Sequence, residues 1–138
     1  MSARADAATF WLYILELANG HLYTGYARDL VRRYSQHCSG KGARTTRISV
    51  PRRIAACWRL RCTIGDALRL EAMVKRGGRP LKQRLIADPA RLRQVVRRCA
   101  LAVRVSLADP KQVGEDRGAK PVTPQPRTTR SRPSRLAR

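Results

Sequence analysis

Three ionisable side chains fall on the apolar faces of two predicted helices, and this placement is the first sign of chemistry in the sequence. Helical spacing puts Arg33 and His37 on the apolar face of residues 29–40, and Glu71 on the apolar face of residues 63–75. An inward-facing charge is costly unless it is paired, bound to a ligand or open to a cleft. Two helices that both carry such groups therefore predict a shared polar site.

Carboxylates are scarce, which narrows the choice of a cation ligand. Lys and Arg number 30 against 9 Asp and Glu. Helix caps and the N-terminal arm account for most acids of residues 1–100, namely Asp6, Asp29, Asp66 and Asp88. Glu16 and Glu71 remain, and Glu71 is the better ligand for a hard cation. One carboxylate, completed by water and substrate phosphates, is a normal way to hold Mg²⁺.

Three segments have the composition of strands: residues 10–17, 21–26 and 54–62. Asn19-Gly20, between the first two, is the strongest local hairpin signal in the chain. These two segments also carry Tyr13 and Tyr23. The hairpin is therefore expected to bring two phenol groups beside the polar faces of the helices.

The length of the hairpin loop decides whether the two tyrosines can share a site. A two-residue turn would place them on opposite faces of the sheet. A three-residue loop over residues 18–20, with Gly20 left-handed as a bulge, pairs positions whose numbers sum to 38. Tyr13 then opposes Gly25, which leaves open space beside its ring, and Tyr23 lies on the same face. We predict the three-residue loop.

The rest of the chain predicts helices and a tail. The sequence "RGGRP" at residues 76–80 interrupts the second helix, and another helix starts at Pro80. Residues 88–107 predict a basic amphipathic helix, and residues 108–138 a disordered basic tail rich in Pro and Arg. One face of the predicted basic helix carries Leu92, Val95, Val96, Cys99 and Val103.

The net charge predicts a polyanionic partner. The formal charge is +21 on 138 residues, with a pI near 11.6. Nucleic acid is the favoured partner because it binds through counterion release from phosphates. An anionic membrane surface is a weaker candidate, and no apolar run is long enough to span a bilayer. In the basic loop after the first helix, Lys41, Arg44 and Arg47 are expected to contact phosphates, although a solvated loop is a fair alternative.

The four cysteines show no metal-binding spacing and are expected to be reduced, mostly buried thiols of a cytosolic protein. If the protein is bacterial, a location at the nucleoid follows from its charge. The sequence also allows a protein partner that it does not identify.

Taken in order, several segments resemble the GIY-YIG endonucleases, closest to their small, single-domain bacterial branch. "LYI" (12–14) stands for the first signature triplet and "YTG" (23–25) for the second. "ARDLVRRYSQH" and "SGKGARTTR" follow, and "DALRLEAMVK" resembles the segment that carries the metal-binding glutamate. The resemblance covers residues 10–87, with residues 1–9 as an N-terminal arm. It implies an α+β fold with a small three-stranded antiparallel sheet flanked by helices, here extended by the basic helix and the tail.

The resemblance also implies a role for each site residue. Tyr13 would act as the general base or orient the attacking water, and Tyr23 would hold that water and contact the scissile phosphate. Arg33 would stabilise negative charge on the phosphate, and His37 would assist proton transfer or contact the phosphate. Glu71 would ligate a single Mg²⁺ or Mn²⁺ ion.

Structural interpretations compete with these roles. The tyrosines would be ordinary half-buried strand residues, Arg33 and Glu71 a buried ion pair, and His37 a group that only caps its helix. The resemblance favours a divalent-metal-dependent endonuclease that acts on DNA and selects structure rather than sequence. The alternatives are a non-catalytic nucleic-acid-binding module that keeps the fold, or an RNA- or ribosome-associated basic protein.

Overall fold

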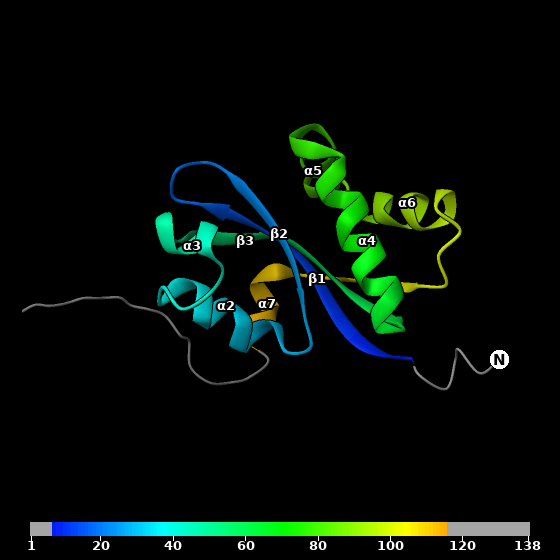
Figure 1. Cartoon of the computed structure of the whole chain (residues 1–138), viewed down its shortest axis with the longest axis horizontal. Helices are drawn as coiled ribbons and strands as arrows, with labels where there is room; N and C mark the ends of the chain where they lie inside the picture. The colour runs from blue at the N-terminus through cyan, green and yellow to red at the C-terminus, as the bar shows by residue number, and fades with distance from the viewer. Residues whose placement is uncertain (1–6, 116–138) are drawn as a thin grey trace, which may run out of the picture.

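The computed structural model describes residues 7–115 of the chain. Its strands form a single sheet with helices on both sides (Figure 1). In chain order the elements are β1 (Ala8–Leu17), β2 (Leu22–Ala27), α2 (Leu30–Cys38), α3 (Arg44–Ile48), β3 (Pro51–Cys62), α4 (Ile64–Arg76), α5 (Gly78–Ala87), η1 (Pro89–Arg91), α6 (Leu92–Arg98), β4 (Arg104–Ala108) and α7 (Pro110–Glu115). The α+β class is as predicted.

The sheet has four antiparallel strands in the order β2-β1-β3-β4, so the prediction of three strands was wrong. The predicted helix over residues 88–107 was also wrong in its second half. Helix α6 ends at Arg98, and Ala100 takes a positive φ of 53° that turns the chain. After this turn β4 pairs with the outer edge of β3, from Arg61 opposite Arg104 to Cys57 opposite Ala108.

The hairpin between β1 and β2 has the predicted register. The amide of Leu17 donates to the carbonyl of His21 at 2.9 Å, which closes a three-residue loop, and Gly20 has a φ of +88°. Tyr13 therefore lies opposite Gly25, and Leu15 lies opposite Tyr23. The prediction of a three-residue loop, with both tyrosines on one face, is confirmed.

Helix α5 also fixes this hairpin. Arg79 donates from Nη1 to the carbonyl of Gly20 at 3.0 Å, and Lys82 donates from Nζ to the carbonyl of Leu22 at 3.1 Å. Strand β2 is an edge strand, so one side of it lacks a neighbouring strand. The two contacts hold the end of β2 from which Tyr23 projects.

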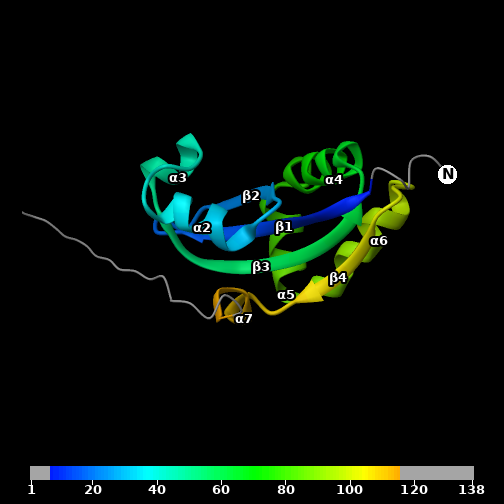
Figure 2. The ribbon, with the colours of Figure 1, turned by 90° about the horizontal axis from the view of Figure 1, so that it is seen from below.

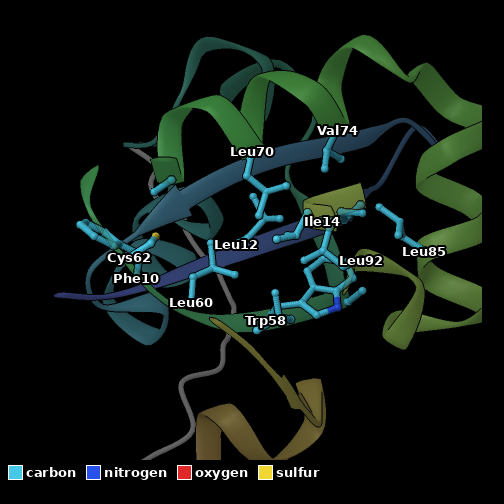
Figure 3. Packing of buried hydrophobic residues seen from close by; sticks show 14 residues of the cluster. Phe10, Leu12, Ile14, Trp58, Leu60, Cys62, Leu70, Val74, Leu85 and Leu92 are labelled. Atoms are coloured by element: carbon cyan, nitrogen blue, oxygen red, sulfur yellow. The ribbon is translucent and has the colours of Figure 1, made fainter. Parts of the chain in front are cut away.

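Two hydrophobic clusters lie on opposite faces of the sheet. The larger one lies under α4, α5 and α6 and includes Leu12, Trp58 and Leu70 (Figure 3). The smaller one contains Tyr13 and Leu30 and is closed by Val113 from α7. Taken together, Figures 1 and 2 place α4, α5 and α6 on one side of the sheet, and α2, α3 and α7 on the other.

Helix α4 presents a different face to the core from the one its spacing suggested. Its buried residues are Ala67, Leu70 and Val74, whereas Ile64 and Leu68 are 55% and 44% exposed. Glu71 therefore lies beside the buried stripe rather than in the middle of it. The predicted break is present, because α4 ends at Arg76 and α5 starts at Gly78, where φ is +68°.

The start of the predicted disordered tail, residues 108–138, was wrong. Residues 110–115 form α7, and Val113 is buried in the smaller cluster. Residues 116–138, the remainder of the predicted tail, and residues 1–6 of the predicted arm lie outside the described part of the chain. Within residues 7–115 no helix combines the length and apolar character needed to cross a membrane.

Candidate active site

A directed chain of hydrogen bonds runs from β1 through α2 to α3. The Tyr13 hydroxyl lies 3.0 Å from Nε2 of His37, and Nδ1 of His37 lies 2.7 Å from the Thr46 hydroxyl. Thr46 has one hydroxyl proton, which it donates to the carbonyl of Ala43 at 2.9 Å. Nδ1 of His37 must therefore carry the ring proton, and Nε2 accepts the proton of the Tyr13 hydroxyl.

All three residues of this hydrogen-bonded series are buried. Tyr13 is 1% exposed, and His37 and Thr46 are each 0% exposed. Asp29 caps α2 by accepting from the amide of Arg32 at 3.1 Å. Helical spacing from this cap brings His37, in the last turn of α2, against the sheet beside Tyr13. The predicted apolar face of α2, with Arg33 and His37 on it, is confirmed.

Two glycines leave room for the Tyr13 hydroxyl and for the His37 ring. A Cβ built on Gly25 would lie 2.5 Å from the Tyr13 hydroxyl, and one built on Gly42 would overlap Nδ1 of His37. The space that the sequence assigned to Gly25 is therefore filled by the Tyr13 hydroxyl itself. The second triplet ends in glycine because the tyrosine of the first triplet lies directly over it.

We expect Gly25→Ala to disturb this packing measurably. The added methyl group must displace the Tyr13 hydroxyl from His37, and overpacking of this kind costs about 1–3 kcal/mol of unfolding free energy. Urea unfolding monitored by circular dichroism measures the loss. Gly65→Ala is the control, because its Cβ would approach no side-chain atom closer than 3.7 Å, and it should not lower the unfolding free energy. Equal stabilities for the two variants would contradict the packing.

Burial sets the protonation states of the pair. Burial, followed by the charge of Arg33, lowers the pKa of His37 to about 4, so the imidazole is neutral at pH 7. Burial and then Tyr23 raise the pKa of Tyr13, while a hydrogen bond and the charge of Arg33 oppose this rise. The protein therefore carries a neutral phenol that donates to a neutral imidazole.

The lowered pKa of His37 predicts that acid destabilises the fold. The unfolded chain, with a histidine pKa near 6.5, binds more protons than the folded one between about pH 6.5 and pH 4. The unfolding free energy should therefore fall by about 3 kcal/mol as the pH drops through this window. Urea unfolding of wild type and His37→Gln across this range gives a difference curve in which other titrating groups cancel. A flat difference curve would contradict the pKa shift.

Tyr23 and Arg33 form the partly exposed side of the site. The ring of Tyr23 lies 6.5 Å from that of Tyr13 and 5.2 Å from that of His37, measured between centroids. Arg33 donates from Nη1 to Oε1 of Gln36 at 2.9 Å and is held beside the Tyr13 hydroxyl. Four predicted residues, Tyr13, Tyr23, Arg33 and His37, thus lie together on one face of the sheet.

Glu71, on α4, lies close enough to Tyr13 for its charge to raise the pKa of that residue. Its carboxylate pairs with Nζ of Lys75 at 3.3 Å. Among the described residues no ion pair joins Glu71 to Arg33, so the interpretation of these two as a buried structural pair was wrong. Glu71 pairs with Lys75 and Arg33 with Gln36 instead.

The donor set around Glu71 suits a hard cation that keeps much of its own hydration. No group of three or more His, Cys, Asp or Glu side chains within residues 7–115 is arranged to hold a metal ion. A protein-built cage is therefore excluded for that part of the chain. A single carboxylate oxygen donor with open positions for water and phosphate fits Mg²⁺ or Mn²⁺ rather than zinc.

Basic residues border the site on the side of α3. Lys41 in the loop after α2, and Arg44 and Arg47 on α3, are all exposed. Arg44 and Arg47 flank Thr46, which sequence reasoning did not single out. A threonine in a short helix has no periodic signal, and only its contact with His37 reveals its part in the site.

Comparison with known proteins assigns the fold to a nuclease-type domain. Residues 9–84 match the GIY-YIG catalytic domain, and the chain belongs to this family. A UPF0213 protein of Halalkalibacterium halodurans is 42% identical over 77 residues, covering 56% of this chain and 81% of the relative. A UPF0213 protein of Pseudomonas aeruginosa strain UCBPP-PA14 is 38% identical over 98 residues, covering 68% and 90%. No solved structure matches the chain.

Proposed function

We propose that the protein is a divalent-metal-dependent endonuclease that hydrolyses phosphodiester bonds in DNA and selects nucleic-acid structure rather than base sequence. The observation that carries the proposal is the directed chain from Tyr13 through His37 to Thr46. A protein that only binds phosphates does not need such a chain of hydrogen bonds. The charge of +21 on this protein supplies affinity for a polyanion by itself.

The chain is arranged to move a proton away from an attacking water. Because the Tyr13 hydroxyl donates to Nε2 of His37 and accepts from Arg33, one lone pair of its oxygen is left to accept a proton from water. As that proton arrives, the phenolic proton passes to Nε2. Thr46 holds Nδ1 in the protonated form, which keeps Nε2 as the acceptor.

Two positive groups favour ionisation of the Tyr13 hydroxyl and stabilise the negative charge that grows on the phosphate. Arg33 already lowers the pKa of Tyr13 and supplies donors for the charge that grows on the phosphate. A cation held by Glu71 would cancel the carboxylate charge that now raises the Tyr13 pKa. When bound, such a cation acts as a Lewis acid on a phosphate oxygen and stabilises the leaving alkoxide.

The remaining residues position the substrate. Tyr23 and Arg33 are the partly exposed members of the site, so the water and the scissile phosphate would enter past them. Lys41, Arg44 and Arg47 would hold neighbouring phosphates. Such contacts fix register without reading bases, which is why we propose selection by structure.

Incubation with branched, nicked and linear DNA, with and without Mg²⁺ or Mn²⁺, tests the proposal. RNA of the same sequence serves as a further arm. Metal-dependent cleavage of at least one DNA substrate, absent from an identically prepared Glu71→Gln sample, is the expected result. Tight binding without cleavage of any substrate would reject the enzyme and favour a binding module. Cleavage of RNA alone would reject DNA as the substrate.

A further inference from the structure

Within residues 7–115, the site-side face of the sheet beyond Tyr13 and Cys57 is largely exposed. The register aligns the side chains of this face in cross-strand rows. One row contains Tyr13 and Cys57, which are buried, and the next contains Trp11, Arg59 and Ser106. The outermost row contains Thr9, Arg61 and Arg104. In the two outer rows Trp11 is partly buried and the other five residues are exposed. We call these six residues the open strand face.

The charge of the open strand face is entirely positive. Arg61 and Arg104 lie directly opposite each other on β3 and β4, and like charges in that position destabilise a sheet. Within residues 7–115 none of its three arginines forms an ion pair. The carboxylate of Asp109 follows β4 at the covered end, where its charge reaches Cys57. An anion bound between Arg61 and Arg104 would relieve their repulsion.

Arg59 is held in a fixed orientation by Trp11. Its guanidinium carbon lies 5.0 Å from the centroid of the Trp11 ring. A guanidinium over an aromatic face is attracted by the π-electrons and keeps its N–H groups free at its edge. Such an edge matches the two oxygens of a phosphate. Trp11 therefore acts as a support that orders the donor before a ligand arrives.

The open strand face continues directly from the candidate active site. Trp11 is two residues from Tyr13 on β1, so the two rows are roughly 7 Å apart at about 3.3 Å per residue. The arginines of the outer rows therefore follow the site along the strands at a spacing that suits successive phosphates of one chain.

We propose that the open strand face binds the sugar–phosphate backbone of the nucleic-acid strand that runs on from the scissile phosphate. Arg59, Arg61 and Arg104 contact its phosphates, and the proposal rests on the proposed nuclease function for the position of that strand. A nucleic-acid strand fits better than a protein partner because the face is positive throughout and Trp11 is its only large apolar side chain.

The test compares two triple variants of equal charge in the absence of metal, so that no cleavage intervenes. One is Arg59→Gln/Arg61→Gln/Arg104→Gln. The control is Arg84→Gln/Arg91→Gln/Arg98→Gln, whose exposed arginines belong to the helices of the other side. Fluorescence anisotropy over a salt series measures binding of a labelled DNA duplex, a single strand and RNA of the same sequence.

We expect the first variant to lose about 0.9 of the log–log salt slope on duplex for each lost contact, about 2.7 in all, and the control to keep the wild-type slope. Equal slopes for the two variants would overturn the proposal. Urea unfolding checks that the triple variant is folded, and relief of the Arg61–Arg104 repulsion should not lower its stability. If the triple variant is unfolded, Arg61→Gln alone repeats the test, with an expected loss of about 0.9 in the salt slope. Loss of slope on RNA as well as DNA would assign the face to both backbones.

Tryptophan fluorescence of the wild type gives a second measurement. Trp58 is 0% exposed in the core, whereas Trp11 lies under Arg59 on the open strand face. Binding should therefore change the emission of Trp11. The emission of Trp58, measured in the variant Trp11→Phe, should stay unchanged. Unchanged Trp11 emission at saturation would overturn the proposal. A protein that binds through this face yet cleaves no DNA with Mg²⁺ would instead refute the nuclease function and keep the surface.

Discussion

Glu71→Gln should abolish metal-dependent DNA cleavage while leaving DNA binding unchanged or tighter. Glutamine keeps the size of the side chain but removes the negative charge, and within residues 7–115 no cluster of acids or histidines can replace it as a metal site. A bound metal stabilises the transition state by several kcal/mol, so the rate should fall by at least about a thousandfold. Binding survives because a carboxylate beside a phosphate backbone only repels it.

Single-turnover cleavage across a series of Mg²⁺ concentrations is the measurement. The fold should be preserved, because the pair of Glu71 with Lys75 is a surface pair worth at most about 1 kcal/mol. Glu16→Gln is the matched control. Glu16 is paired with Arg52 and Arg53 close to the hairpin loop, and its loss should leave the cleavage rate intact. If Glu71→Gln cleaves as fast as Glu16→Gln, Glu71 does not hold the metal.

Tyr13→Phe should lower the cleavage rate by about 10²–10⁴-fold, the usual contribution of a positioned proton-transfer group. The ring remains in the smaller cluster, so the core is preserved. The hydroxyl is lost, and Nε2 of the buried His37 is left without its donor. This unsatisfied acceptor should cost about 1–3 kcal/mol of unfolding free energy, which urea unfolding measures independently of activity.

Tyr26→Phe is the control for this variant. Tyr26 is also a tyrosine of the hairpin, but its ring packs against Phe10, 6.3 Å away between centroids, on the opposite face. It should cleave DNA at the wild-type rate. Wild-type cleavage by Tyr13→Phe would remove Tyr13 from the mechanism, whereas a defect shared by both variants would point to a general loss of hairpin structure.

The hairpin could be predicted because its register depends on local chemistry. Asn19-Gly20 limits the loop to a few conformations, and the requirement for a shared face selects one of them. The buried face of α2 could also be predicted, because this nine-residue helix has one apolar side, on which its buried residues Leu30 and His37 lie.

The elements that the sequence did not predict depend on tertiary contacts. Helix α4 has two candidate apolar faces, one with Ile64 and Leu68 and one with Leu70 and Val74, and only packing against the sheet selects the second. Strand β4 follows α6 in a region whose valines fit either period, and pairing with β3 decides its conformation. Thr46 and α7 become visible only through their contacts with the site and the smaller cluster.

The division of the site between two parts of the chain has an evolutionary consequence. The hydrogen-bonded chain of Tyr13, His37 and Thr46 lies within residues 13–46, whereas the proposed cation ligand Glu71 comes from α4. Helix α4 is held to the sheet by Ala67, Leu70 and Val74, none of which depends on Glu71. If the protein is the nuclease proposed above, a single codon change at Glu71 would turn it into a stable pseudoenzyme that still binds nucleic acid, and restoring that codon would return its activity.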